Sequence, residues 1–272
     1  MGVSEDAVQV SIESILRAKS GNREPSRVLV KVLKKLLCID RVNLFLREAA
    51  DKKNLDFFKS LLENLKVKVE IQGIENLPSS GERSVFASNH PLGALDAVAI
   101  SYEIGKNYPE GIIIPANDVL MYLKNIQDLF VPVNKMGGQE RGLVDAMNEA
   151  YCSVKQVFMF PSGVVSRKNK GKIKDLQWNK SFITKAIASK RNVVPIFVDA
   201  KNSNLFYWVA GMRKRLKIKF NIEMLLLPRE LFKQEKGTFT IKIGKPISWK
   251  TFDNTKTPKE WAGEVRNIVY NL

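Results

Sequence analysis

A single histidine and a nearby aspartate are the residues of this chain best suited to acid–base chemistry. His90 is the only histidine among 272 residues, and Asp96 follows it six positions on. Imidazole has an ordinary pKa near neutrality, so it can be neutral at working pH and accept a proton. A carboxylate that accepts the other ring N–H would fix the tautomer and stabilise the imidazolium. The pair therefore predicts a general base oriented by Asp96, although a His and an Asp that only cap a helix could show the same spacing.

The segments around this pair predict how it is positioned. Residues 84–87 predict a short apolar strand and residues 93–104 predict a helix. Pro91 and Gly93 permit a tight turn between them. Such a strand would carry the histidine to the carboxyl edge of a parallel sheet, where α/β proteins bind ligands. The aspartate would then lie in the first turn of the helix, within reach of the ring.

A second candidate site is a turn followed by a basic segment. An apolar strand at residues 157–160 leads into Pro161-Ser162-Gly163, and the cations beyond it are Arg167, Lys168, Lys170, Lys172 and Lys174. Backbone N–H groups at such a turn, together with nearby cations, can bind an anion. An exposed basic loop without a ligand would have the same composition.

Strands alternate with helices along most of the chain, which predicts an α/β fold with a mostly parallel central sheet flanked by helices. Residues 5–65 have helical patterns, so we expect an N-terminal helical extension at 1–65 and an α/β domain at 66–272. The last helix opens at Thr257-Pro258-Lys259-Glu260, a capping box with proline at the first helical position. The other expected strands are 67–71, 112–115, 129–133, 193–198 and 239–243, and the other expected helices are 119–123, 143–154 and 178–189.

The charge balance predicts an anionic partner. The chain has 44 Lys and Arg against 28 Asp and Glu, a net charge of +16. Nucleic acid, an anionic membrane or an acidic protein or cofactor would each fit this charge. There is no zinc-finger spacing and no aromatic–basic RNA-binding signature, so charge is the only support for nucleic acid. Two distant cysteines, Cys38 and Cys152, are typical of reduced thiols in the cytosol.

One segment could contact a membrane from one side. Residues 205–219 mix aromatic and aliphatic side chains with Lys and Arg, as interfacial helices do. A half-buried helix with a solvated basic face would have the same composition. The basic helix expected at residues 28–37 is a second candidate. No run of 18 apolar residues exists, so no membrane-spanning helix is expected.

Four blocks in one order give the chain a family resemblance. They are Asn89-His90 with Asp96, then Val131 to Lys135, then Phe160 to Gly163, and finally Val194-Pro195-Ile196. Over residues 67–248 the chain resembles the glycerolipid acyltransferases, the lysophosphatidic-acid acyltransferase superfamily. Within that superfamily it is most similar to the bacterial hemolysin-like, ornithine- and glycine-lipid O-acyltransferase branch.

The resemblance implies transfer of a fatty acyl group from acyl-coenzyme A or acyl carrier protein to the hydroxyl of a lyso-lipid or N-acyl amino-acid lipid. His90 would be the base and Asp96 its orienting partner. Backbone N–H groups near Gly93 or Gly163 are candidate oxyanion donors. No bound cofactor or metal is expected, because one His and two distant Cys cannot build a zinc site, while an Asp/Glu magnesium site stays open. The expected substrate-binding residues are Asn89, Gly93, Lys135, Phe160, Pro161, Ser162, Gly163, Arg167 and Lys172.

The chain departs from the common family pattern at three points. Five residues separate His90 from Asp96, where the family has four. Ser162 stands where the family has Glu, and Val165 where it has Arg, with Arg167 as a substitute in a shifted register. In the family this Glu and Arg help bind the phosphorylated glycerol of the acceptor. The departures therefore favour another hydroxyl-bearing acyl lipid, such as an N-acylated amino acid.

We expect the partners to be an anionic membrane surface, the acyl carrier protein or coenzyme A, and a lipid acceptor, with no nucleic acid. The expected location is cytoplasmic, peripherally on the inner face of the cell membrane. Alternatives are a catalytically inactive lipid-binding relative and a basic nucleic-acid-binding protein. A hydrolase with Ser162 as nucleophile is a further alternative, although the Gly-x-Ser-x-Gly elbow is absent.

Overall fold

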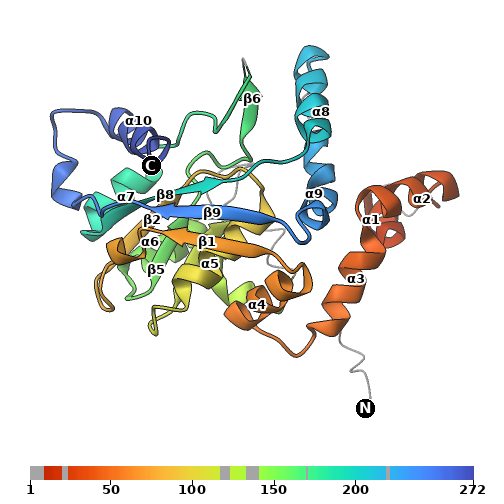
Figure 1. Cartoon of the computed structure of the whole chain (residues 1–272), viewed down its shortest axis with the longest axis horizontal. Coiled ribbons are helices and arrows are strands. Elements are labelled where there is room, and N and C mark those ends of the chain that lie inside the picture. The colour runs from red at the N-terminus through yellow and green to blue at the C-terminus, as the bar shows by residue number, and fades with distance from the viewer. Residues whose placement is uncertain (1–8, 20–23, 117–122, 133–140, 170, 219–220) are drawn as a thin grey trace.

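The chain forms an α/β structure with one large, mostly parallel sheet, as the sequence predicts (Figure 1). The computed structural model describes residues 9–19, 24–116, 123–132, 141–169, 171–218 and 221–272. The helix expected at 119–123 and the end of the strand expected at 129–133 fall partly outside this range.

Within the described residues, the central sheet has seven strands in the order β1-β9-β8-β2-β5-β3-β4. β9 runs antiparallel to β8, and the other neighbouring pairs are parallel. The carboxyl end of β2 therefore lies between those of β5 and β8, at the middle of the sheet. The strands are β1 (Lys68–Gln72), β2 (Ser84–Ser88), β3 (Ile112–Ala116), β4 (Phe130–Pro132), β5 (Gln156–Met159), β8 (Asn192–Asp199) and β9 (Thr238–Ile243).

Helices cover both faces of the sheet, and further helices extend from one side of it (Figure 1). The α-helices are α1 (Ile12–Lys19), α2 (Arg27–Leu36), α3 (Ile39–Glu48), α4 (Asn54–Asn64), α5 (Ala94–Gly105), α6 (Arg141–Cys152), α7 (Ser181–Ser189), α8 (Asn204–Arg215), α9 (Leu227–Lys233) and α10 (Pro258–Val269). Short 3-10 helices are η1 (Ile74–Asn76), η3 (Gln127–Leu129), η4 (Ile222–Leu226) and η5 (Trp249–Thr251).

The strands divide their side chains between two hydrophobic cores. Within β2, Phe86 joins the core under α4 and α5, whereas Val85 and Ala87 join the core under α6, α7 and α10. In β5, Phe158 joins the first of these cores and Val157 joins the second. All of these residues are buried, which explains why the strands are nearly continuous apolar runs. Burial on both faces fixes the register of β2, and with it the position of the loop that follows.

The N-terminal helices do not all lie outside the main core. α4 packs against α5, and its Phe57, Phe58, Leu61 and Leu62 belong to the same core as the sheet. α1 and α2 extend away from the sheet (Figure 1), whereas Phe45 and Leu46 of α3 lie in the same core as α4. The division at residue 65 stays a prediction about domains, and the packing unit of the sheet begins before it, in α3.

The sequence analysis did not predict two groups of secondary-structure elements in the C-terminal half of the chain. The basic segment after residue 166 is a β-hairpin, β6 (Arg167–Asn169) and β7 (Lys172–Lys174), and η4 with α9 follows α8. A third, smaller core joins these parts, with Val165, Phe206, Tyr207 and Leu226 buried in it. The two hairpin strands contain a single apolar residue, Ile173, so the sequence carries little hydrophobic signal to predict them.

The start of α10 is confirmed as a capping box. The hydroxyl of Thr257 accepts from the backbone N–H of Glu260 at 3.3 Å, and the Glu260 carboxylate accepts from the Thr257 N–H at 2.7 Å. Pro258 occupies the first helical position. Each partner thus satisfies a backbone donor that the helix start leaves open.

A fully buried arginine supports the amino edge of the sheet. The guanidinium of Arg191 donates to the carbonyls of Tyr151 at 2.7 Å, Ser153 at 2.5 Å, Lys155 at 2.8 Å and Ser84 at 3.3 Å. These carbonyls belong to the end of α6, the loop after it and the start of β2. Burial, aided by the charge of a neighbouring arginine, lowers the pKa of Arg191 to about 10. The cation therefore satisfies carbonyls that would otherwise be buried without donors.

We predict that Arg191→Met lowers the free energy of unfolding by about 3 kcal/mol, because methionine retains an unbranched apolar chain but the four carbonyls lose their donors. Urea unfolding followed by circular dichroism measures this change. The control is Arg47→Met on the exposed surface of α3, with an expected loss below about 0.5 kcal/mol. Equal losses in the two variants would contradict a structural role for Arg191.

Candidate active site

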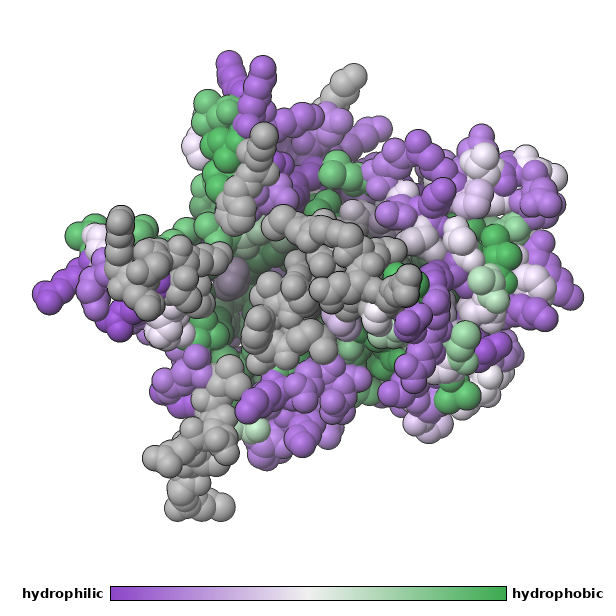
Figure 2. Space-filling model, turned by 180° about the vertical axis from the view of Figure 1, so that it is seen from behind, coloured by the Kyte–Doolittle hydropathy of each residue, from purple (hydrophilic) through white to green (hydrophobic). Residues whose placement is uncertain are grey.

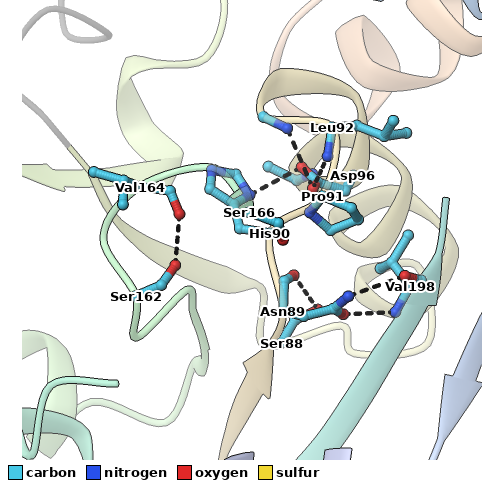
Figure 3. A network of polar contacts seen from close by, with 12 residues as sticks. Ser88, Asn89, His90, Pro91, Leu92, Asp96, Ser162, Val164, Ser166 and Val198 are labelled. Atoms are coloured by element: carbon cyan, nitrogen blue, oxygen red, sulfur yellow. Dashed lines mark hydrogen bonds and ion pairs between the residues drawn. The ribbon is translucent and has the colours of Figure 1, made fainter. Parts of the chain in front are cut away.

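The end of β2 is joined to β8 by the side chain of Asn89. Its amide N–H donates to the carbonyl of Val198 at 3.0 Å, and its amide oxygen accepts from the Val198 N–H at 2.7 Å (Figure 3). Asn89 is buried, so its amide extends the backbone pairing of the two strands by one step beyond the ladder. The residue expected to bind substrate thus has a structural contact that holds the next residue, His90, at the carboxyl edge.

Asp96 is a buried carboxylate in the first turn of α5. It accepts from the backbone N–H groups of Leu92 at 2.8 Å, Gly93 at 3.3 Å and Ala97 at 2.8 Å (Figure 3). Gly93 has φ +89°, and a Cβ there would lie 3.1 Å from the side chain of Leu227. Only glycine therefore fits the turn that brings these N–H groups onto the carboxylate.

The imidazole of His90 faces this carboxylate. Nδ1 of His90 lies 3.1 Å from Oδ1 of Asp96, and the side chains are 17% and 0% exposed respectively. The spacing of five intervening residues therefore brings the two groups together. The ring also packs on Phe160, with 4.3 Å between ring centroids. The Asp96 carboxylate therefore orients the ring through Nδ1, and Nε2 is the second ring nitrogen.

The turn after β5 lies beside the histidine. Figure 3 shows the imidazole between Asp96 and the segment that carries Ser162 and Val164. The hydroxyl of Ser162 donates to the carbonyl of Val164 at 2.6 Å, and the N–H of Gly163 donates to the carbonyl of Phe160 at 2.9 Å. The Ser162 hydroxyl therefore closes its own turn, which gives the hydrolase alternative no activated nucleophile. Pro161 accepts from the Asn179 N–H through its carbonyl.

The N–H groups expected to stabilise an oxyanion are already hydrogen-bonded. The N–H of Gly93 donates to Asp96, and that of Gly163 donates within its turn. Either would have to exchange its partner to serve an oxyanion, so the sequence-based expectation stays a prediction. Among the described residues, no three His, Cys, Asp or Glu side chains are grouped as metal ligands.

The cations of the second candidate site differ in their surroundings. Arg167 pairs with the buried Glu223 at 2.7 Å, and Arg213 pairs with the same carboxylate at 2.9 Å. Burial lowers the pKa of Arg167, and the Glu223 charge opposes that shift. Lys172 is exposed on β7, and Lys135 lies outside the described residues. In this structure Arg167 links the hairpin to η4 and α8, and its contact with substrate stays a prediction.

Asp175 is a buried residue of this site that the sequence analysis missed. Its Oδ1 accepts from the His90 N–H at 3.2 Å and from the Ser166 hydroxyl at 2.5 Å, and its Oδ2 accepts from the Trp178 indole at 2.9 Å. Burial raises the pKa of Asp175, while these hydrogen bonds and the charge of His90 oppose the rise. A single aspartate after a basic run has no motif around it, so only the fold reveals its place under the histidine.

The arrangement as a whole can take a proton from a bound hydroxyl. The half-buried imidazole of His90 is oriented by the buried Asp96 carboxylate. The backbone N–H of the same residue donates to a second buried carboxylate, that of Asp175. An oriented imidazole suits the activation of an alcohol, which is a weak nucleophile by itself.

The chain belongs to a family of acyltransferases, whose model matches residues 15–272, and it is therefore an enzyme of that class. It is 44% identical over 265 residues to the lyso-glycine lipid O-acyltransferase of Phocaeicola vulgatus, and the matched region covers 97% of this chain and 95% of the relative. It is equally similar to the protein of that name from Bacteroides thetaiotaomicron, with 97% of each chain covered. The resemblance inferred from the four sequence blocks is confirmed.

A solved structure is also similar. The 1-acyl-sn-glycerophosphate acyltransferase of Thermotoga maritima matches with a TM-score of 0.47 and 17% identity, over 95% of this chain and 87% of its own.

We predict that Asp96→Asn lowers kcat by about 10²- to 10⁴-fold, because the amide no longer favours the tautomer and the imidazolium that the base needs. Steady-state thiol release measures the effect. Asp56→Asn is a matched control, since Asp56 holds the same third position in the exposed first turn of α4. Wild-type kcat in a folded Asp96→Asn protein would contradict the dyad.

Proposed function

We propose that this enzyme moves a fatty acyl group from an acyl thioester to the hydroxyl of a lyso-lipid or N-acyl amino-acid lipid, with His90 as general base. The observation that carries the proposal is the 3.1 Å contact between His90 and the buried Asp96 at the carboxyl edge of the sheet. The names of the two relatives, both lyso-glycine lipid O-acyltransferases, support a hydroxyl-bearing acyl lipid as acceptor.

The proposed reaction has a simple proton balance. Nε2 of His90 takes the proton of the acceptor hydroxyl as that oxygen bonds to the thioester carbonyl carbon. The carbon–sulfur bond then breaks, and the leaving thiolate receives the proton from the imidazolium. The products are an ester and a free thiol. Base catalysis of this kind supplies about 10²- to 10⁴-fold, and positioning of the two substrates supplies much of the rest.

The acceptor we favour is an N-(3-hydroxyacyl) amino-acid lipid such as the glycine lipid. Val165 stands where the common family pattern has a phosphate-binding arginine, and it is fully buried in the small third core. An apolar, water-excluded side chain offers nothing to a phosphate. The cation nearest in sequence, Arg167, is paired with Glu223. A phosphorylated glycerol acceptor is therefore less well supported than an acceptor with a single carboxylate.

For the donor we propose acyl carrier protein or acyl-coenzyme A, both of which are anionic. The β6–β7 hairpin carries the exposed lysines Lys168, Lys172 and Lys174. Its first strand follows directly on Ser166, whose N–H donates to the His90 carbonyl at 2.8 Å. A basic arm that starts beside the base is suitably placed to attract a phosphate-bearing donor.

We also propose peripheral attachment to an anionic membrane on the cytoplasmic face, through α8 and α2. Trp208 of α8 is 63% exposed and Val28 of α2 is 73% exposed. Both helices carry cations in the last turn, and Figure 2 shows hydrophobic residues beside hydrophilic ones on the projecting parts of the molecule. Aromatic and aliphatic groups next to Lys and Arg suit the interface of a bilayer. No helix among the described residues is long and apolar enough to cross a membrane.

The reaction is tested by thiol release from palmitoyl-coenzyme A and palmitoyl carrier protein against lysophosphatidic acid, N-(3-hydroxyacyl)glycine and N-(3-hydroxyacyl)ornithine. We predict acceptor-dependent turnover, highest with an amino-acid lipid, and a loss of about 10³-fold or more in His90→Ala. Turnover that survives in His90→Ala would refute the base. A folded wild-type protein that binds vesicles but releases no thiol with any pair would favour the inactive lipid-binding alternative.

Membrane attachment is tested separately by co-sedimentation with vesicles that contain phosphatidylglycerol. We predict that Trp208→Glu weakens binding about tenfold. The variant loses the indole area that would be buried in the bilayer, and it adds a negative charge at an anionic surface. Val154→Glu is the matched control, since Val154 is equally exposed but precedes β5 at the opposite edge of the sheet. Equal binding by the two variants would reject α8 as a contact.

A further inference from the structure

The main chain of His90 is part of a closed ring of hydrogen bonds. Its N–H donates to Oδ1 of Asp175 at 3.2 Å, and its carbonyl accepts from the N–H of Ser166 at 2.8 Å. The hydroxyl of Ser166 completes the ring by donating to the same Oδ1 at 2.5 Å. Both polar groups of the His90 backbone are therefore fixed by one carboxylate and its serine partner.

The carboxylate of Asp175 is itself held from several directions. Trp178 donates its indole N–H to Oδ2 at 2.9 Å. From α10, Arg266 donates to the Asp175 carbonyl at 2.7 Å, and the Tyr270 hydroxyl accepts from its N–H at 2.6 Å. These contacts fix both the backbone and the side chain of a residue that is almost fully buried. A carboxylate placed this firmly can define the position of the group above it.

We propose that Asp175 is a positioning residue of the acyl transfer, which holds the His90 backbone so that the imidazole meets Asp96 on one side and the acceptor hydroxyl on the other. The proposal rests on His90 as the base. Asp96 fixes the rotation of the ring, and Asp175 fixes the main chain from which the ring extends. A base shifted by a fraction of an ångström loses its alignment with the hydroxyl, so the effect falls on kcat rather than on binding.

Asp175 also places a second negative charge next to the base. Asp96 faces the ring from α5, and Asp175 lies under the backbone. Among the described residues, Arg266 of α10 and Tyr270 just after that helix also contact Asp175, both at its main chain. An anion near an imidazolium stabilises the protonated form. Removing the Asp175 charge should therefore move the acid limb of the rate profile to lower pH.

The test compares Asp175→Asn, Ser166→Ala and His90→Ala by steady-state thiol release across pH 5 to 9. For Asp175→Asn we expect kcat to fall about 10- to 100-fold with KM within about threefold, and the acid limb to move down by about half a pH unit. For Ser166→Ala, which breaks the ring but keeps the charge, we expect a smaller fall in kcat and an unmoved limb. Asp128→Asn, an exposed change just before β4 at the opposite edge of the sheet, is the control.

The outcomes separate this proposal from the assignment of the base. If His90→Ala abolishes turnover while folded Asp175→Asn keeps the wild-type kcat and limb, the base stands and the positioning role falls. If His90→Ala keeps turnover, the base itself is refuted and the positioning role falls with it. If Asp175→Asn does not fold, Ser166→Ala decides, because a lowered kcat at unchanged KM supports the ring and a wild-type kcat overturns it.

Discussion

The burial of the Asp96 carboxylate is the constraint on which the site depends. A charged group with no exposed surface requires hydrogen-bond donors, and the nearest are the N–H groups of Leu92, Gly93 and Ala97. Bringing them onto one carboxylate demands a tight turn between β2 and α5, with Gly93 at positive φ. That turn in turn sets the distance from the strand end to the helix, and it leaves one carboxylate oxygen facing the imidazole. The burial of Asp96, the tight turn and the contact with the imidazole therefore depend on one another.

The sheet makes this turn reproducible. β2 is a middle strand, buried on both faces and paired with β5 and β8. A shift of its register by one residue would therefore move the side chains of each face into the other core. Asn89 then extends the pairing with β8 beyond the ladder, and Asp175 holds the backbone of the following residue. His90 is therefore supported by a neighbouring strand, by the first turn of α5 and by the segment after the hairpin. It lies on a loop that begins at β2 and ends at α5, both of them rigid elements.

Opposite charges outside the site are used to join elements. Glu223 lies between Arg167 of the hairpin and Arg213 of α8, so a single buried carboxylate connects two segments that are distant in sequence. The excess of positive charge is instead displayed on the hairpin, α2 and α8. The paired cations hold the structure together, and the exposed cations suit the anionic partners proposed above.

The sequence by itself determined the class of fold, most strands and helices, the capping box of α10 and the pair His90 and Asp96. These depend on local signals, namely periodicity, turn residues and the chemistry of a lone imidazole. It did not reveal Asp175, the hairpin or the Arg167–Glu223 pair, and it assigned Arg167 to substrate alone. The Arg167–Glu223 pair and the contact of Asp175 with His90 join segments 50 or more residues apart, and the hairpin has too little hydrophobic pattern to be recognised. Tertiary structure decided them, because burial and partner choice are set by which surfaces the folded chain brings together.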